Sequence, residues 1–206
     1  MTQIQPLSFV HRFEPGSDPT RPPILLLHGT GGDEDDLLPL GRLIAPGSPL
    51  LSPRGKAIER GMPRFFRRLS EGVFDEDDIR RRAGELADFT AEARAAYRLA
   101  APVAVGFSNG ANIAAAVMLL RPEALGGAVL LRAMAPFRDP PEADLTGTPV
   151  LLLSGEADPI APAESAARLA ATLMGAGAAV QREILPGGHQ LSQADAVLAR
   201  DWIARL

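Results

Sequence analysis

Short apolar segments alternate along the chain with longer segments in which hydrophobic residues recur every three or four positions. The apolar segments are continuous, partly β-branched and bounded by Gly or Pro, and they occupy 23–27, 101–105, 127–131 and 149–154. Continuous runs of this length are typical of strands that are buried on both faces. Residues 7–13 alternate between apolar and polar positions instead, as expected for an edge strand.

Helical patterns fill the intervals between these strands. In 75–100 apolar and small residues recur at steps of three and four, and Asp75 precedes them as a candidate N-cap. Further helices are expected over 110–121, 161–174 and 191–205. This alternation predicts an α/β fold with a mainly parallel sheet, helices on both faces and ligands at the carboxyl ends of the strands.

Composition narrows the function mainly by exclusion. With 206 residues we expect one domain spanning 1–206, and the net charge of −4 gives no basic surface for nucleic acid. The absence of Cys excludes disulfides and thiolate ligands, and we expect no metal and no cofactor. No apolar run approaches the roughly 20 residues of a membrane span, and no secretory signal is visible, so we expect a cytoplasmic protein.

A G-x-S-x-G motif lies between the strand at 101–105 and the helix at 110–121. It reads Gly106-Phe107-Ser108-Asn109-Gly110. Such a turn needs glycine on both sides of a serine held in a strained, exposed conformation, which is the geometry of a catalytic nucleophile. The alternative is a Gly-rich turn in which Ser108 only caps the helix.

The loop after the strand at 23–27 reads His28-Gly29-Thr30-Gly31-Gly32. A loop in this place commonly supplies one backbone donor of an oxyanion hole. We predict the N–H groups of Thr30 and Asn109 as the two donors, because fixed backbone donors need no reorganisation during reaction. A phosphate-binding loop is the alternative, but its G-x-G-x-x-G spacing is absent.

Three histidines are available as a general base. His11 lies in the expected edge strand and His28 in the glycine-rich loop, whereas His189 follows the strand at 179–185 and precedes the last helix. We therefore predict His189 as the base. Asp158, after the strand at 149–154, is the predicted orienting acid, and Glu156 is the alternative.

The motifs together resemble the phospholipase/carboxylesterase family of α/β-hydrolases, the relatives of acyl-protein thioesterases. The resemblance is carried by LLLHGTGGDEDDL, GFSNGANIA, SGEADPIAP and GGHQLS. It implies a three-layer α/β-hydrolase fold with a triad of Ser108, Asp158 and His189. The segment 52–79 resembles the bacterial carboxylesterases associated with quinone and hydroquinone stress, which implies that 62–66 borders the substrate site.

One departure from the family concerns the two oxyanion donors. Thioesterase relatives commonly have Leu and Gln where this chain has Thr30 and Asn109. Both positions donate through the backbone, so the departure bears on the acyl group rather than on hydrolysis, and a long fatty acyl substrate is less favoured. The interval between Val129 and Pro149 is too short for a cap domain, so we expect none.

The substrate wall is expected in the segment 62–66. Met62, Phe65 and Phe66 are candidates for an apolar wall, and the alternative is that the two aromatic residues belong to the core.

The same segment is locally basic. Its arginines, Arg64, Arg67 and Arg68, are expected to pair on the surface with Glu71, Asp75 or Asp77. The alternative is that these arginines attract an anionic substrate.

These features predict a serine carboxylesterase that hydrolyses small to medium carboxylic esters through an acyl-enzyme. The partner is then a small-molecule ester, and a homodimer is left open. A lysophospholipase or acyl thioesterase would use the same residues with a longer groove. A non-catalytic protein that holds an aromatic ligand in the same fold is a third hypothesis, although a receptor has no need of all three triad groups.

Overall fold

The computed structural model describes residues 7–70 and 72–206, and its centre is a seven-stranded sheet with the order β1-β3-β2-β8-β9-β10-β11. The strands are β1 (His11–Glu14), β2 (Ile24–Leu27), β3 (Leu50–Pro53), β8 (Val103–Phe107), β9 (Gly127–Leu131), β10 (Pro149–Gly155) and β11 (Ala179–Leu185). All neighbours pair in parallel except β1, the expected edge strand, which is antiparallel to β3. The sheet is therefore mainly parallel, as the pattern predicts.

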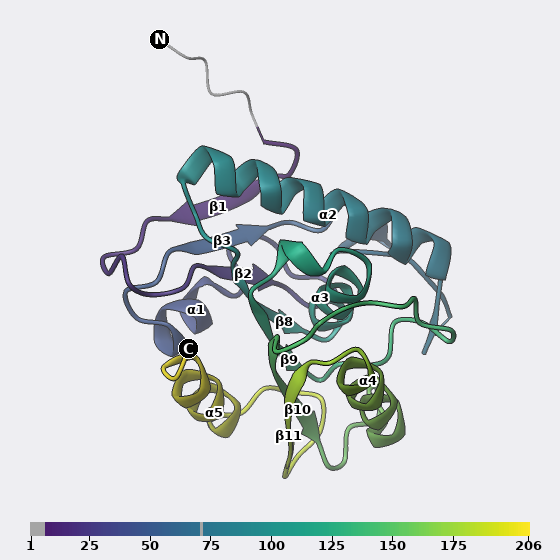
Figure 1. Ribbon diagram of the computed structural model, residues 1–206. Helices are drawn as coiled ribbons and strands as arrows, with labels where there is room; N and C mark the ends of the chain where they lie inside the picture. The colour runs from purple at the N-terminus through teal and green to yellow at the C-terminus, as the bar shows by residue number, and fades with distance from the viewer. Residues whose placement is uncertain (1–6, 71) are drawn as a thin grey trace.

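Helices cover both faces of this sheet (Figure 1). They are α1 (Leu38–Ile44), α2 (Glu76–Tyr97), α3 (Asn109–Leu120), α4 (Ala163–Gly175) and α5 (Gln193–Ile203), with a short 3₁₀ turn at Pro122–Ala124. Strand residues alternate between two hydrophobic clusters, one with α2, α3 and α4 and the other with α1 and α5. This alternation follows from the period of two in a strand, and it confirms the three-layer arrangement.

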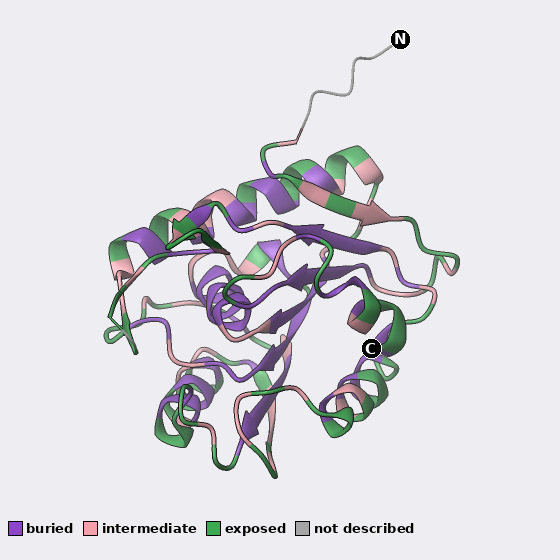
Figure 2. Ribbon diagram, turned by 180° about the vertical axis from the view of Figure 1, so that it is seen from behind, coloured by how far each residue is buried: buried purple, intermediate pink, exposed green. Residues whose placement is uncertain are grey.

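Burial follows the same layers. Figure 2 shows the inner strands as buried and the outward surfaces of the helices as exposed. All four residues of β2 and all five of β9 are buried, which is why these strands are continuous apolar runs in the sequence. The long helix α2 begins where expected, because the Asp75 side chain accepts the N–H of Asp78 at 3.1 Å.

Several short elements were not predicted from the sequence. They are α1, β3 and two small hairpins, formed by β4 (Ala57–Glu59) with β5 (Met62–Arg64) and by β6 (Arg68–Ser70) with β7 (Val73–Phe74). The hairpins lie between β3 and α2 and bring residues 57–70 and 72–74 to the end of the sheet where β8 meets α3. The expected absence of a cap domain agrees with the stretch 132–148, which contains no helix or strand. Across residues 7–70 and 72–206, none of the helices has the length and apolar character to cross a membrane.

Candidate active site

Ser108 occupies a strained turn between β8 and α3. Its backbone has φ 52° and ψ −111°, a conformation that residues with a side chain rarely adopt. The turn is tight: a Cβ on Gly110 would lie 1.9 Å from the carbonyl oxygen of Leu27, and one on Gly106 would lie 2.5 Å from that of Gly110. Glycine is therefore required on both sides of the serine, as the motif implies.

A row of hydrogen bonds joins Ser108 to two side chains from distant parts of the chain. The Ser108 hydroxyl oxygen lies 2.9 Å from Nε2 of His189, and Nδ1 of His189 lies 2.8 Å from Oδ2 of Asp158. Asp158 Oδ1 also accepts the backbone N–H groups of Ile160 and Ala161, at 2.8 and 2.9 Å. The Asp158 side chain is 1% exposed and that of His189 is 18% exposed, so the imidazole bridges a buried carboxylate and an accessible hydroxyl.

The alternative acid and the other histidines lie elsewhere. Glu156 is exposed in the same turn as Asp158. His11, on the edge strand β1, bonds the Phe9 carbonyl oxygen and the hydroxyl of Tyr97 at the end of α2, each at 2.8 Å. Ser108, His189 and Asp158 are therefore the predicted groups that the fold brings together.

The loop that carries His189 is held by a buried arginine that sequence reasoning missed. Arg132, directly after β9, donates from Nε to the Gly188 carbonyl oxygen at 3.0 Å and from Nη2 to that of Gln190 at 3.1 Å. The same guanidinium makes two bonds to Asp195, at 2.6 and 2.9 Å. Arg132 thus fixes the backbone on both sides of His189.

The charge of Arg132 is balanced within this network. Burial opposes ionisation of Asp195, but its bonds to Arg132 and to Ser192 outweigh that effect and lower the pKa of the carboxyl. The only sequence indication was an arginine at the end of an apolar strand, at the carboxyl edge where sites form in this class of fold.

The glycine-rich loop after β2 is tied to its surroundings through His28. Its Nδ1 donates to the Gly29 carbonyl oxygen at 2.7 Å, and its Nε2 accepts the N–H of Gly55 at 3.0 Å. Burial lowers the pKa of His28, so the neutral ring serves as a bridge between backbone groups. A further bond from the Gly31 N–H to the Pro63 carbonyl oxygen, at 2.9 Å, fixes the loop against β5.

The backbone N–H groups of Thr30 and Asn109 belong to residues that line one cavity with Ser108. Within residues 7–70 and 72–206, neither N–H donates a hydrogen bond to the protein. Asn109 is the first residue of α3, where the helix dipole adds positive potential. These donors are available to a bound anion or carbonyl oxygen.

The cavity beside Ser108 has a volume of about 240 Å³. Its lining comprises Thr30, Arg64, Arg68, Gly72, Phe74, Phe107, Ser108, Asn109, Asn112, Met134, Ile160 and His189. Four loops, both hairpins and the turn between β8 and α3 contribute to it, and its apolar side chains come from segments far apart in the sequence. In the described part of the chain, no group of three or more His, Asp or Glu residues is placed to hold a metal ion.

Comparison with known proteins decides the family. The Phospholipase/Carboxylesterase family profile matches residues 10–205. The chain belongs to this family. The Bacillus subtilis (strain 168) protein with the name "Putative hydrolase MhqD" is 47% identical over 181 residues, or 87% of this chain and 90% of that protein. The α/β-hydrolase fold and the resemblance proposed from the motifs are thereby confirmed.

Solved carboxylesterase structures superimpose on nearly the whole chain of this family member. The carboxylesterase of Bacillus cereus has a TM-score of 0.93 and 42% identity, over 96% of this chain and 94% of that one. The carboxylesterase of Mesorhizobium loti has a TM-score of 0.91 and 34% identity, over 97% and 96%. The chain is accordingly a member of a hydrolase family with carboxylesterases among its structural relatives.

The residues expected to form a substrate wall are not in the cavity lining of this family member. Phe65 and Phe66 are 2% and 0% exposed and belong to the hydrophobic core, while Met62 lies on the surface against Gly31. Phe65 still contributes to the site through its backbone, since its N–H donates to Asn109 Oδ1 at 2.7 Å. The apolar lining comes instead from Phe74, Phe107, Met134 and Ile160.

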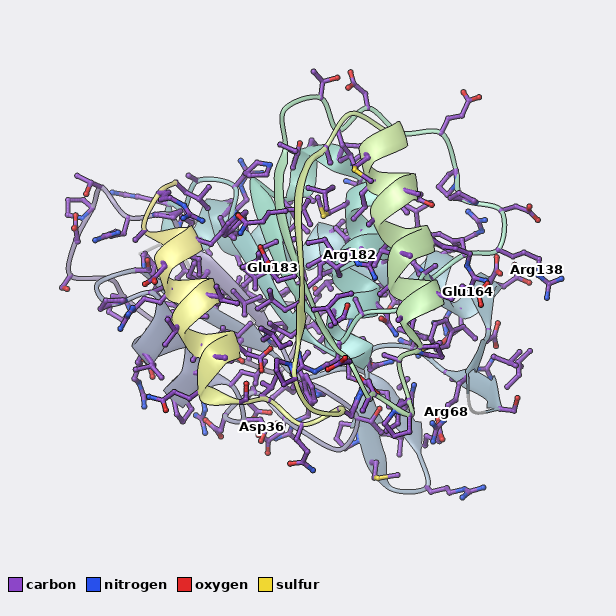
Figure 3. The ribbon with its side chains drawn as sticks, turned by 90° about the horizontal axis from the view of Figure 1, so that it is seen from below. Asp36, Arg68, Arg138, Glu164, Arg182 and Glu183 are labelled. Atoms are coloured by element: carbon purple, nitrogen blue, oxygen red, sulfur yellow. The ribbon has the colours of Figure 1, made fainter. Side chains whose placement is uncertain are left out.

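The arginines of the basic segment separate into two groups. Arg67 pairs on the surface with Asp75 at 2.7 Å, as expected. Arg64, on β5, and Arg68, on β6, depart from that expectation, because both pair with Glu59 on β4. Arg68 lies on the side of the molecule where α4 begins (Figure 3). The expected partner Glu71 lies outside the described residues.

Proposed function

We propose that the protein is a serine carboxylesterase that hydrolyses small to medium carboxylic esters through an acyl-enzyme. The observation that carries this proposal is the hydrogen-bonded row of Ser108, His189 and Asp158 opening onto the cavity. The Ser108 hydroxyl attacks the ester carbonyl carbon while Nε2 of His189 takes its proton. Asp158 holds the Nδ1–H tautomer and stabilises the imidazolium, without itself taking the proton.

The negative charge on the carbonyl oxygen is stabilised by the N–H groups of Thr30 and Asn109. Both are unengaged in the described protein, and the second stands at the N-terminus of α3. The tetrahedral intermediate then collapses, and the alcohol leaves with the proton from His189. Water attacks the acyl-enzyme by the same route, with His189 again as base, and releases the acid.

The size of the cavity favours a compact ester. Its volume of about 240 Å³ is below the roughly 300–1,000 Å³ of pockets that enclose drug-sized ligands. A lysophospholipase or a long-chain thioesterase would require more room for its acyl chain. Met134 and Ile160 supply the apolar contacts that we assign to the substrate wall. A cytoplasmic location and a homodimer stay predictions.

Covalent labelling tests the nucleophile. A fluorophosphonate should add once to the native protein and not at all to Ser108→Ala, because only a hydroxyl paired with a base is activated. Ser70→Ala, at an exposed serine outside the cavity, is the control that should label fully. An adduct that persists in Ser108→Ala, seen by intact-mass spectrometry, would contradict the proposal and favour the non-catalytic hypothesis.

A further inference from the structure

One wall of the cavity beside Ser108 is basic. Arg64 and Arg68 line the same cavity as Ser108 and His189, and their side chains are 4% and 29% exposed. Arginines on a surface are normally surrounded by water, which screens their charge. A guanidinium enclosed in a cavity wall acts through a lower effective dielectric, so its attraction for an anion is stronger.

The positive charge of this wall exceeds the negative charge beside it. Glu59 is the carboxylate that meets both arginines, at 3.4 Å from Arg64 Nη1 and 2.9 Å from Arg68 Nε. Within residues 7–70 and 72–206 no other carboxylate pairs with either guanidinium, and no Asp or Glu lines the cavity. Among the described residues two cations therefore share one anion, which leaves a surplus of one positive charge in this part of the wall.

The wall also has hydrogen-bond donors to spare. Arg64 donates from Nε to the Phe66 carbonyl oxygen at 3.1 Å, and in the described chain its terminal nitrogens make no other hydrogen bond. Arginine carries five N–H donors, so most of those on Arg64 remain for a ligand. Burial lowers the pKa of Arg64, yet arginine stays charged at neutral pH.

Another unsatisfied donor lies beside the nucleophile. Asn109 is 2% exposed and lines the cavity, and its Oδ1 is engaged by the N–H of Phe65. That bond fixes the orientation of the amide, so Nδ2 is the donor, and among the described residues this buried atom has no acceptor. A buried donor without a partner is costly, and an anionic oxygen would remove that cost.

Building on the esterase assignment, we propose that this site selects esters that carry a carboxylate group, which Arg64 and Arg68 bind while the scissile carbonyl lies at Ser108. A surplus of one charge matches a monoanion, and the apolar remainder of the lining suits the short carbon chain between carboxylate and ester. A planar guanidinium matches a carboxylate in geometry as well as in charge. The carboxylate can belong to the acyl part or to the alcohol part of the ester.

Matched pairs of esters test this inference and separate the two sources. Phenyl hemisuccinate and phenyl levulinate differ only in a terminal carboxylate or its neutral methyl-ketone isostere on the acyl part. The compounds meta-acetoxybenzoate and meta-acetoxyacetophenone differ in the same way on the alcohol part. Product release is followed by chromatography, with Ser108→Ala protein as the blank for spontaneous hydrolysis. We expect the wild type to prefer the carboxylate member of one pair by about tenfold in kcat/KM, the scale of one charged hydrogen bond.

Variants assign that preference to the basic wall. Arg68→Met should remove the preference by lowering kcat/KM for the carboxylate member about tenfold, since the ligand's charge is recognised there. Arg67→Met is the matched control, because this neighbouring arginine is 63% exposed, pairs with Asp75 and does not line the cavity. Arg64→Lys retains the buried charge and should weaken the preference partly, which avoids the folding defect expected of Arg64→Met.

The outcomes distinguish this inference from the function on which it rests. Equal rates for both members of both pairs, or a preference that survives Arg68→Met, would overturn carboxylate selection and leave the esterase intact. Hydrolysis of none of the four esters would contradict the esterase itself and the inference with it. A preference lost equally in Arg67→Met would show that general surface charge, rather than the cavity wall, attracts the substrate.

Discussion

Arg132 and Arg64 are both buried arginines near the same serine, but their donors are used differently. Arg132 makes two bonds to Asp195 and three more to the carbonyl oxygens of Gly188, Gln190 and Leu153. Arg64 makes one bond to a carbonyl oxygen, and its carboxylate partner is shared with another arginine. A guanidinium whose donors all bind groups of the protein stabilises the structure, whereas one with free donors in a cavity can bind a ligand.

The two arginines also differ in what they hold in place. Arg132 donates hydrogen bonds to the backbone on both sides of His189, so it affects the reaction through the position of the base. Arg64 donates a hydrogen bond to the carbonyl oxygen of Phe66, a residue of the core, and it affects the reaction by binding the substrate. Substitutions should separate these roles, because a positioning residue changes kcat for every ester and a binding residue changes the order of esters.

The largest effect on kcat is expected from a substitution in the triad itself rather than at either arginine. Asp158→Asn should lower kcat by roughly 10⁴, because the neutral amide no longer holds His189 in the tautomer that accepts the serine proton. Glu156→Gln, in the same turn but exposed, is the matched control and should leave kcat within a few-fold. Steady-state kinetics with phenyl acetate measures both. A larger loss in Glu156→Gln than in Asp158→Asn would mean that the acid is wrongly assigned.

The Arg132 network should show the next largest effect, on stability and kcat together. Arg132→Met leaves the Asp195 carboxylate buried without its partner, a change that costs about 3–5 kcal/mol in comparable pairs. Urea unfolding should therefore show a large fall in the free energy of unfolding, and kcat should fall for neutral and anionic esters alike. Arg64→Lys is the comparison and should change the order of esters with little loss of kcat for neutral ones.

The stability that Arg132→Met loses should depend on pH in a definite direction. The pKa of Asp195 is lowered in the folded protein, so the pair contributes its full stability above the usual aspartate pKa of about 4 and loses it as pH falls through the folded value. The difference in unfolding free energy between wild type and Arg132→Met should therefore be full at neutral pH and narrow below about pH 4. A difference that stays constant into acid would exclude the Asp195 charge as its source.

The strands, the long helix and the triad could be predicted from the sequence, whereas the roles of these two arginines could not. Strands β2 and β9 are evident in the sequence because they are buried on both faces and are therefore continuous apolar runs. The long helix α2 is evident because it is buried on one face, so its apolar and small residues recur every three or four positions. Ser108, Asp158 and His189 follow three strands in an order that points to one sheet edge.

The networks around those residues are not visible in the sequence. Arg132 and Asp195 are 63 positions apart, and no local pattern relates them. Arg64 was expected at the surface because hairpins of two- and three-residue strands have no recognisable period, but in the structure it lies opposite Ala57 in the β4–β5 hairpin and is buried. The expectation that Phe65 and Phe66 form the substrate wall departs from the structure for the same reason. Composition indicated an apolar segment, but it did not indicate that these two side chains face the core.

The smallest effect on catalysis is expected at Met134, and it distinguishes the cavity wall from the core behind Arg64. Met134 lines the cavity, so Met134→Ala should shift the preferred acyl length by one or two carbons, at about 1–3 kcal/mol per mismatched methylene. Phe66, fully buried and in contact with Arg64 through its carbonyl oxygen, should instead cost about 3–5 kcal/mol of stability when truncated to Ala. Because a core residue supports the whole fold, Phe66→Ala should keep the order of a phenyl acetate to hexanoate series even where all rates fall. Thermal melts and that ester series on both variants supply the comparison. A changed order in Phe66→Ala together with an unchanged order in Met134→Ala would return the substrate wall to the segment 62–66 and move the binding role away from Met134.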